Sequence, residues 1–388
     1  MRMGIGEFVP GPAVPPYHRA EFLDVLVPLR SRVEVNSRHR DRRLGPRWRR
    51  GCRGSTGLVL AGLLFGMIAV ASARPLEVSG RAMGTTWSVK WVPANTAVDA
   101  TALERDVAGR LEELEQIFST YRPRSVISRF NANESTEWIQ VPPELATVVE
   151  ASCHVSARTD GAYDVTVLPL LELWGFAGAP APDRAPGPAA LARARELVGW
   201  RKLDVTLDPP ALRKREGGVR IDVSSMAKGF AVDAISGRLQ RVGVSNHLVA
   251  VGGDLRARGD GPEGDGWRVA IEAPAPAGDP IAEVLHLRDA ALSTSGNHRN
   301  RVRVGRGDAG HILDPRTGVP AAGSLASVSV VAATCAISSA LATGLFVLGA
   351  EEGWALARQE HISALFLIRS NGELRKQPTA EFSRPPAR

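Results

Sequence analysis

Carboxylate, imidazole and hydroxyl side chains stand beside glycines in several short segments of this 388-residue chain. Asp164 lies in GAYDVTV, Asp254 follows two glycines in VGGDL, and His311 lies in GHILDP. Carboxylate and hydroxyl oxygens suit Mg²⁺, and an imidazole can accept and return a proton near neutral pH. The same residue types also occur in plain turns, hairpins and buried core positions. None of these segments therefore predicts an activity by itself.

The segment TCAISSALATGLFVLG (334–349) adds a helical spacing to these residue types. Ser339 and Thr343 are four residues apart, so a helix would place both hydroxyls on one face. Such a face could form one wall of a metal-assisted active site. A carboxylate would be expected on that wall, but this chain has Ser338 and Ser339 there.

Hydrophobic periodicity predicts the elements that would position these segments. The predicted helices are 99–119, 142–159, 189–198 and 224–242. The predicted strands occupy 76–92, short runs within 202–221, and the segments HLVAVGGDLRARG and WRVAIEAP, with a Pro- and Gly-rich loop at 175–188. Internal repeats and clear linkers are not visible in the sequence. We therefore predict one α+β domain over residues 76–370, followed by a polar, solvated tail at 371–388.

The charge distribution argues against a nucleic-acid-binding protein. Of the 48 Lys and Arg residues, 12 lie in residues 1–54, together with 5 of the 41 Asp and Glu residues. Residues 55–388 are therefore neutral, with 36 residues of each sign. The sequence has no basic helical stripe interleaved with aromatic side chains, which nucleic-acid binding would favour.

The apolar run LVLAGLLFGMIAVASA (58–73) follows an Arg-rich segment and ends in Ala-Ser-Ala. This order is typical of a secretory signal peptide. The run is shorter than the roughly 17–25 residues of a membrane span, although an uncleaved membrane anchor is an alternative. We predict a signal peptide or membrane anchor at 55–73. The Arg- and Pro-rich residues 1–54 are predicted to be disordered or to precede the true start.

In sequence order, a series of segments resembles the motifs of the ApbE family of FAD:protein FMN transferases. The segments are MGTTWSV (83–89), STYRPRSVISRFN (119–131), GAYDVTVLPLLELWGF (161–176), DVSSMAKGFAVD (222–233), VGGDLRARG (251–259), ALSTSGNHRN (291–300), GHILDPRTGVP (310–320) and TCAISSALATGLFVLG (334–349). Each motif is weak alone, and their common order carries the resemblance.

The resemblance implies a single α+β domain with a T-fold-like core and a flavin-handling enzyme of the bacterial envelope. Such an enzyme binds FAD as its substrate and uses Mg²⁺ to polarise the pyrophosphate. It transfers FMN through a phosphoester to a Thr or Ser of an envelope acceptor protein and releases AMP. Some members instead hydrolyse FAD to FMN and AMP. The implied location is the periplasm or the periplasmic face of the inner membrane.

The residues that the resemblance assigns fall into three groups. The flavin contacts carry over to Met83, Tyr121, Ala162, Tyr163, Asp164, Asp222, Lys228 and Ile312. The metal ligands carry over to Ser225, through its backbone carbonyl, and to Ser339, Ala342 and Thr343. His311 and Asp314 lie in the family's His-x-x-Asp-Pro motif, where either could accept the proton of the incoming hydroxyl.

Physical chemistry supports some of these assignments and leaves alternatives for others. The two tyrosines could stack on flat rings, and Lys228, near the start of a predicted helix, could hold phosphate oxygens. Core packing is the alternative for Met83 and for both tyrosines.

The chain departs from the family pattern at Ser339, which stands where a metal-binding Asp is expected. A serine is neutral and shorter, so Mg²⁺ should bind more weakly, although FAD brings its own phosphate charges. Asp254 or Asp314 could compensate for the missing carboxylate. Three functions therefore stay open: the FMN transferase, which we favour, a flavin-binding or delivery protein with impaired catalysis, and an FAD pyrophosphatase.

Overall fold

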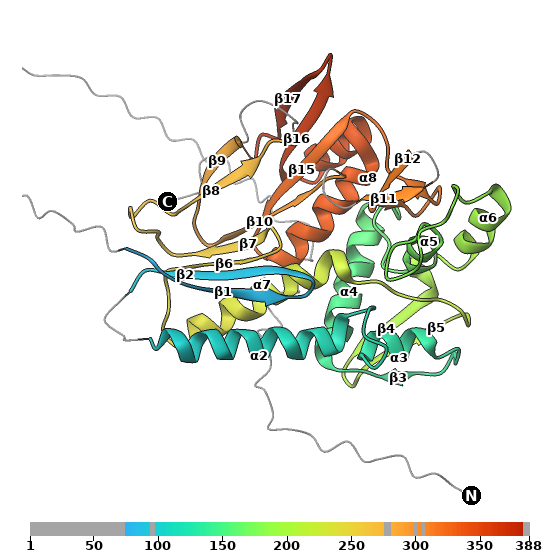
Figure 1. Ribbon diagram of the computed structural model, residues 1–388, viewed down its shortest axis with the longest axis horizontal. Coiled ribbons are helices and arrows are strands. Elements are labelled where there is room, and N and C mark those ends of the chain that lie inside the picture. Colours follow the sequence, from blue (N-terminus) through green and yellow to red (C-terminus); the bar gives the residue numbers. More distant parts are fainter. Residues whose placement is uncertain (1–73, 94–97, 275–280, 298–300, 305–306, 383–388) are drawn as a thin grey trace, which may run out of the picture. The chain divides into compact units, whose positions relative to one another are not determined.

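An eight-stranded antiparallel sheet runs through the centre of the fold in this computed structural model (Figure 1). The structure describes residues 74–93, 98–274, 281–297, 301–304 and 307–382. In spatial order the strands are β1 (Leu76–Ala82), β2 (Thr85–Trp91), β6 (His247–Val251), β7 (Asp254–Arg258), β10 (Ala290–Ser295), β15 (Leu325–Ala332), β16 (Ser363–Ser370) and β17 (Glu373–Pro378). Every neighbouring pair is antiparallel.

The helices connect and cover the strands of this sheet. They are α2 (Ala100–Phe118), α3 (Val126–Ala132), α4 (Pro143–Arg158), α5 (Leu168–Leu173), α6 (Pro188–Glu196), the 3₁₀-helix η1 (Trp200–Lys202), α7 (Ser224–Arg241) and α8 (Cys335–Gln359). Three of them pack on one face of the sheet: α2 contacts β1, α7 contacts β6 and β7, and α8 contacts β10 and β15 (Figure 1).

A β-hairpin covers the opposite face of the sheet. Strands β8 (Trp267–Glu272) and β9 (Ile281–Leu287) carry Trp267, Ile271 and Leu287 into a buried cluster. Ala257, on β7, and Leu292, on β10, enter the same cluster from the sheet. Since side chains alternate across a strand, the residues next to them, at 256 and 293, point to the helical face.

Smaller sheets complete the fold beside α3, α5 and α6. They are β3 (Ile139–Gln140) with β5 (Pro210–Lys214) and β4 (Leu203–Leu207), β11 (Arg301–Val304) with β12 (Gly307–Gly310), and β13 (Leu313–Asp314) with β14 (Val319–Pro320). Leu170 and Trp174, from the α5 region, pack with Val304, Ala309 and Leu313 in a second apolar cluster. That cluster ties the strands around His311 to the helical part.

Two glycines form the turn that delivers Asp254. Gly252 and Gly253 join β6 to β7 with φ of +59° and +97°, a left-handed backbone that other residues rarely adopt. A Cβ at Gly252 would also lie 2.9 Å from the Thr85 side chain. The turn therefore holds Asp254, the first residue of β7, in one position at the start of that strand.

A buried carboxylate connects α7, α8 and the sheet. Oδ1 of Asp233, on α7, accepts from Arg256 Nη1 at 2.7 Å. The same carboxylate accepts the first backbone N–H groups of α8, from Cys335 at 2.9 Å and Ala336 at 3.0 Å. Gly229, one turn earlier on α7, allows a close approach, because a Cβ there would lie 2.4 Å from the Cys335 carbonyl oxygen.

Most predicted elements are confirmed, and one prediction is wrong. The predicted helices at 99–119, 142–159, 189–198 and 224–242 correspond to α2, α4, α6 and α7, and the mixed α+β class is confirmed. Residues 371–388 are not simply a solvated tail, because 373–378 form the edge strand β17 and Thr379 is fully buried. Residues of β17 are mostly exposed, which explains why their polar sequence gave no strand signal.

The apolar run at 58–73 lies outside the described residues, so the predicted export segment stays a prediction. Within the described part of the chain, α8 is the helix with the length and composition to span a membrane. Its most apolar window is 67% buried inside the protein, as expected of a core helix.

We expect Asp233→Ala to destabilise the protein by about 3–5 kcal/mol, because it leaves the buried Arg256 charge uncompensated and α8 uncapped. Urea unfolding followed by circular dichroism would measure the free energy of unfolding. Asp106→Ala is the matched control, since Asp106 also pairs with an arginine, Arg238, but its side chain is 45% exposed. That control should lose at most about 1 kcal/mol. Equal losses in the two variants would contradict the structural role of Asp233.

Candidate active site

A cluster of oxygen atoms lies where α7, β7 and α8 meet. Ser339, on α8, donates its hydroxyl to the backbone carbonyl of Ser225, on α7. The same hydroxyl lies 3.2 Å from Oδ2 of Asp254, on β7. One turn further along α8, the Thr343 hydroxyl lies 3.1 Å from the Ser339 carbonyl oxygen. Ser225, Asp254, Ser339 and Thr343 are called the oxygen cluster below.

The oxygen cluster has the donor types that a hard divalent cation requires. It contains three of the four residues predicted as metal ligands, Ser225, Ser339 and Thr343. The fourth, Ala342, is fully buried and offers only a methyl side chain. Among the described residues, no group of three or more His, Cys, Asp or Glu could hold a metal ion. Carbonyl, hydroxyl and single carboxylate oxygens fit Mg²⁺ rather than a soft metal.

Asp254 is the carboxylate of the oxygen cluster, and it is 5% exposed. Burial raises the pKa of its carboxyl group, while the charge of Lys228 and hydrogen bonds from Ser293 and Ser339 act in the opposite direction. From the sequence, we predicted Asp254 in a hairpin and considered it only as one possible substitute for the carboxylate missing at Ser339. The structure puts its carboxylate beside that serine.

Two serines of β10 border the oxygen cluster and were not among the predicted site residues. Ser295 lies 3.1 Å from the Thr343 hydroxyl, and Ser293 lies 2.8 Å from the hydroxyl of Ser338. The two serines alternate in ALSTS, which would place both on one face of a strand, and this pattern could have identified them. A strand had not been predicted there.

Asp222 and Tyr121 lie near one another at the start of α7. The Asp222 carboxylate accepts the Ser224 N–H at 2.9 Å, which orders the chain as it enters the helix. Partial burial raises the pKa of Tyr121, and the charge of Asp222 adds to this effect. Tyr121 is nevertheless 70% exposed, so its ring is accessible to a planar ligand.

The AYD run of predicted flavin contacts lies in the core. Ala162, Tyr163 and Asp164 are 1%, 4% and 7% exposed. The Tyr163 hydroxyl lies 3.1 Å from Ser152, and burial raises the pKa of this tyrosine to about 12. The Asp164 carboxylate accepts N–H groups of Thr166 at 2.8 Å and Trp200 at 2.9 Å. Tyr163 thus packs in the core and Asp164 orders a turn, while their flavin contacts stay predictions.

Met83 lies in the turn between β1 and β2, and Lys228 lies on α7. Met83 adopts a positive φ of 52° between β1 and β2, and its N–H donates to Glu115. Lys228, on α7, donates to the Ser224 carbonyl at 3.2 Å. The Lys228 side chain passes Gly252, where a Cβ would lie 3.3 Å from its Cδ. Its charge is close enough to lower the pKa of Asp254 against the effect of burial.

The segment of His311 is fastened to the end of β10. Asn297 Oδ1 accepts the Ile312 N–H at 3.2 Å, and the Asn297 amide donates to the Ala321 carbonyl at 3.1 Å. Asn297 is two residues beyond Ser295, which contacts Thr343. The chain thereby links the half-buried His311 to the neighbourhood of the oxygen cluster.

Asp314 is held by an arginine. Arg316 Nε lies 3.0 Å from Asp314 Oδ1, and Arg316 Nη2 lies 3.0 Å from Oδ2. This two-point pair occupies both carboxylate oxygens and holds the Asp314 side chain in place. Of the two predicted catalytic residues, Asp314 is the one whose two side-chain oxygens are both engaged by an arginine.

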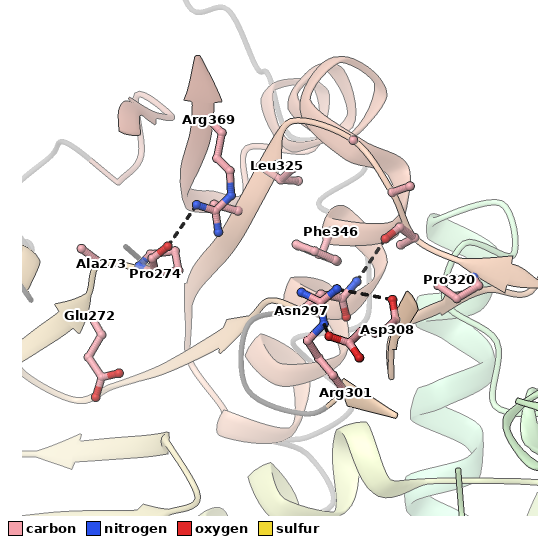
Figure 2. Close-up of a pocket in the computed structure, with 15 residues that line it drawn as sticks. Glu272, Ala273, Pro274, Asn297, Arg301, Asp308, Pro320, Leu325, Phe346 and Arg369 are labelled. Atoms are coloured by element: carbon pink, nitrogen blue, oxygen red, sulfur yellow. Dashed lines mark hydrogen bonds and ion pairs between the residues drawn. The ribbon is translucent and has the colours of Figure 1, made fainter. Parts of the chain in front are cut away.

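A cavity of about 650 Å³ lies beside the His311 segment. Figure 2 shows Asn297, Arg301, Asp308, Phe346 and Arg369 around it. Arg369 donates to the Pro274 carbonyl at 3.1 Å across one wall. The lining includes none of the predicted site residues. Gly310 precedes His311 in the chain, and Phe346 lies on α8 three residues after Thr343. Residues 275–280 and 298–300, which adjoin the cavity in sequence, lie outside the described residues.

Comparison with known proteins matches the chain to flavin transferases. Residues 83–366 match the ApbE family. The FAD:protein FMN transferase of Vibrio cholerae is 34% identical over 84% of this chain and 97% of the relative. That of Haemophilus influenzae is 34% identical over 82% of this chain and 96% of the relative.

Solved structures give the same result for the fold. The flavin transferase ApbE from Vibrio cholerae superimposes with a TM-score of 0.74 and 34% identity, covering 80% of this chain and 98% of that one. The flavinyl transferase ApbE of Pseudomonas stutzeri, in its apo form, has a TM-score of 0.72 at 34% identity and covers 80% and 96%. The family match, the relatives and the shared fold agree: the chain belongs to the ApbE family.

Proposed function

We propose that this protein is an FAD:protein FMN transferase, which moves FMN from FAD to a Thr or Ser hydroxyl of an acceptor protein. Relatives with that name match nearly their whole length. The observation that carries the proposal is the oxygen cluster beside Lys228. Breaking a pyrophosphate requires stabilisation of negative charge on its oxygens, and cations next to hard oxygen ligands provide it.

In the proposed reaction, the acceptor hydroxyl oxygen bonds to the phosphorus of the FMN half of FAD. The bond between that phosphorus and the bridging oxygen breaks, and AMP leaves with the bridging oxygen. The proton of the hydroxyl passes to a base on the enzyme. Phosphoryl-type transfer depends chiefly on positioning and charge neutralisation, so the residues that hold the pyrophosphate matter most.

Three residues of the oxygen cluster would hold Mg²⁺: Ser225 through its carbonyl, and Ser339 and Thr343 through their hydroxyls. When bound, the ion would neutralise charge on the pyrophosphate oxygens. Lys228 would add a positive charge from the first turns of α7, whose N-terminal N–H groups favour anions.

His311 would accept the proton of the acceptor hydroxyl. The Arg316 pair keeps Asp314 in place as a positioning residue, so that the turn after His311 stays ordered. The exposed ring of Tyr121 is the flat surface on which a flavin or adenine ring would stack.

Ser339 is the observation that favours a second candidate, a flavin-binding protein without transfer. A neutral ligand gives a cation less attraction than a carboxylate does. An FAD pyrophosphatase would use the same cluster with water in place of the acceptor hydroxyl. The first experiment below separates all three.

We also propose that the protein acts in the periplasm or at the periplasmic face of the inner membrane. The apolar run at 58–73, with basic residues before it and Ala-Ser-Ala at its end, supports export. The acceptor would then be an envelope protein.

We expect the purified full-length protein, given FAD, Mg²⁺ and a pool of Thr-containing peptides from periplasmic proteins, to attach FMN to a peptide and release AMP. Mass spectrometry would detect the modified peptide, and chromatography the AMP. The same peptide with Val in place of Thr should stay unmodified, and EDTA should stop the reaction. AMP without a modified peptide would indicate a pyrophosphatase, and bound FAD without AMP would indicate a binding protein.

We expect His311→Asn to slow AMP release at saturating FAD and peptide by about 10²- to 10⁴-fold, the usual contribution of a general base. FAD affinity, measured by fluorescence quenching, should change by less than about threefold. Asp314→Asn serves as the comparison and should slow the reaction by less than about tenfold, because it weakens only a partly exposed ion pair. A larger loss in Asp314→Asn than in His311→Asn would reverse the two roles.

A further inference from the structure

We propose that Asp254 supplies the carboxylate that residue 339 lacks, so that the charge of the cation site comes from β7 rather than from α8. This inference rests on the proposed function only in assuming that a divalent cation enters the oxygen cluster. It goes beyond it by assigning a ligand outside the set that the family resemblance gave.

The position of Asp254 is suited to this role. Its Oδ2 lies 3.2 Å from the Ser339 hydroxyl, so it reaches to within one hydrogen bond of the side chain at position 339. The Gly252-Gly253 turn fixes its backbone, and its pairing with Val251 fixes its direction. A carboxylate held this firmly needs little rearrangement to bind an ion.

The Ser339 hydroxyl has more acceptors nearby than it has hydrogens, which supports a cation among these oxygens. The Ser339 hydroxyl has one hydrogen, but two acceptors lie within its reach: the Ser225 carbonyl and the Asp254 carboxylate. Only one of them can receive that hydrogen. A cation next to the three oxygens would satisfy them together, and a Mg²⁺ ion binds through one or two carboxylates plus water and phosphate oxygens.

The buried charge of Asp254 points the same way. The residue is 5% exposed, and buried carboxylates are normally paired or bound to a metal. Lys228 is the nearby positive charge, but its ammonium donates to the Ser224 carbonyl. Two other buried carboxylates lie nearby: Asp233 already has Arg256 at 2.7 Å and two backbone N–H donors, and Asp222 accepts the Ser224 N–H at 2.9 Å. Asp254 instead accepts from the neutral hydroxyls of Ser293 and Ser339, so its charge is the one available to a bound cation.

Asp314, the other possible substitute, does not fit this role. Both of its oxygens are engaged by Arg316. Binding a cation there would require breaking this two-point pair. An Asp at position 339 would instead stand next to Asp254, and two carboxylates in contact repel unless a cation lies between them. Serine at 339 and a carboxylate at 254 thus form a matched pair.

The test is Mn²⁺ binding to the full-length protein, measured by electron paramagnetic resonance with and without FAD. The variants are Asp254→Asn, Ser339→Asp and the double variant, with Asp265→Asn as the control. Asp265 has a side chain that is 55% exposed and pairs with His286 away from the cluster. Thermal unfolding without metal would verify that each variant is folded.

We expect Asp254→Asn to weaken Mn²⁺ binding by at least about tenfold, since even changes in the outer shell of metal sites cause such losses. The double variant should recover most of the affinity, because it moves the carboxylate back to α8. Asp265→Asn should bind like the unaltered protein. Ser339→Asp alone should bind Mn²⁺ more tightly and unfold at a lower temperature when metal is removed.

Unchanged Mn²⁺ affinity in a folded Asp254→Asn variant would overturn the inference, as would failure of the unaltered protein to bind Mn²⁺ even with FAD. A double variant that stays as weak as Asp254→Asn would also overturn it, because the carboxylate at 339 would not replace the one at 254. These results are independent of transfer. Mn²⁺ binding that depends on Asp254, without peptide modification, would sustain this inference while refuting the transferase.

Discussion

The carboxylate of Asp233 determines how the two long core helices meet. It caps the start of α8 through Cys335 and Ala336 and pairs with Arg256 on the sheet. Ser225 lies two turns before Asp233 on α7, so both residues face α8. On α8, Ser339 lies one turn after Cys335. The hydrogen bonds of Asp233 to the start of α8 therefore also set the position of Ser339 opposite Ser225. Gly229 permits a close approach of α7 and α8, because a larger residue there would push the two helices apart. Few alternative registers of the two helices would keep this contact.

Local pattern was enough to predict the elements that have one polar face. Helix α2 shows its apolar stripe because its other side meets water, and Asp99 caps its first backbone N–H groups. The first half of α8, residues 335–347, and strand β15 gave no such signal, since they are buried on nearly all sides. The sequence did not predict strand β17 for the opposite reason. It is an edge strand held by backbone pairing with β16, and its side chains are mostly exposed.

The site was only partly predictable, because its members come together through the fold rather than through spacing. The pair Ser339 and Thr343 could be read from the sequence as one helical face. The encounter of Asp254 with Ser339 could not, since 85 residues separate them and their contact depends on the β6–β7 turn and on helix register. Tyr163 shows the reverse problem, for a tyrosine suits a ring-stacking site and a core equally well. The sequence does not report burial, and the structure places Tyr163 in the core.

The composition of the oxygen cluster has a consequence for how substrate and cation would bind. One carboxylate with neutral hydroxyl and carbonyl oxygens attracts a divalent cation less than two carboxylates would. If Mg²⁺ and FAD bind here as proposed, the pyrophosphate would provide the remaining negative charge, and the ion would in turn stabilise the pyrophosphate. Such coupling is reciprocal, so each ligand raises the affinity of the other by the same factor. A site with its single carboxylate on β7 would then hold the cation firmly only while FAD is present, which ties metal occupancy to the substrate.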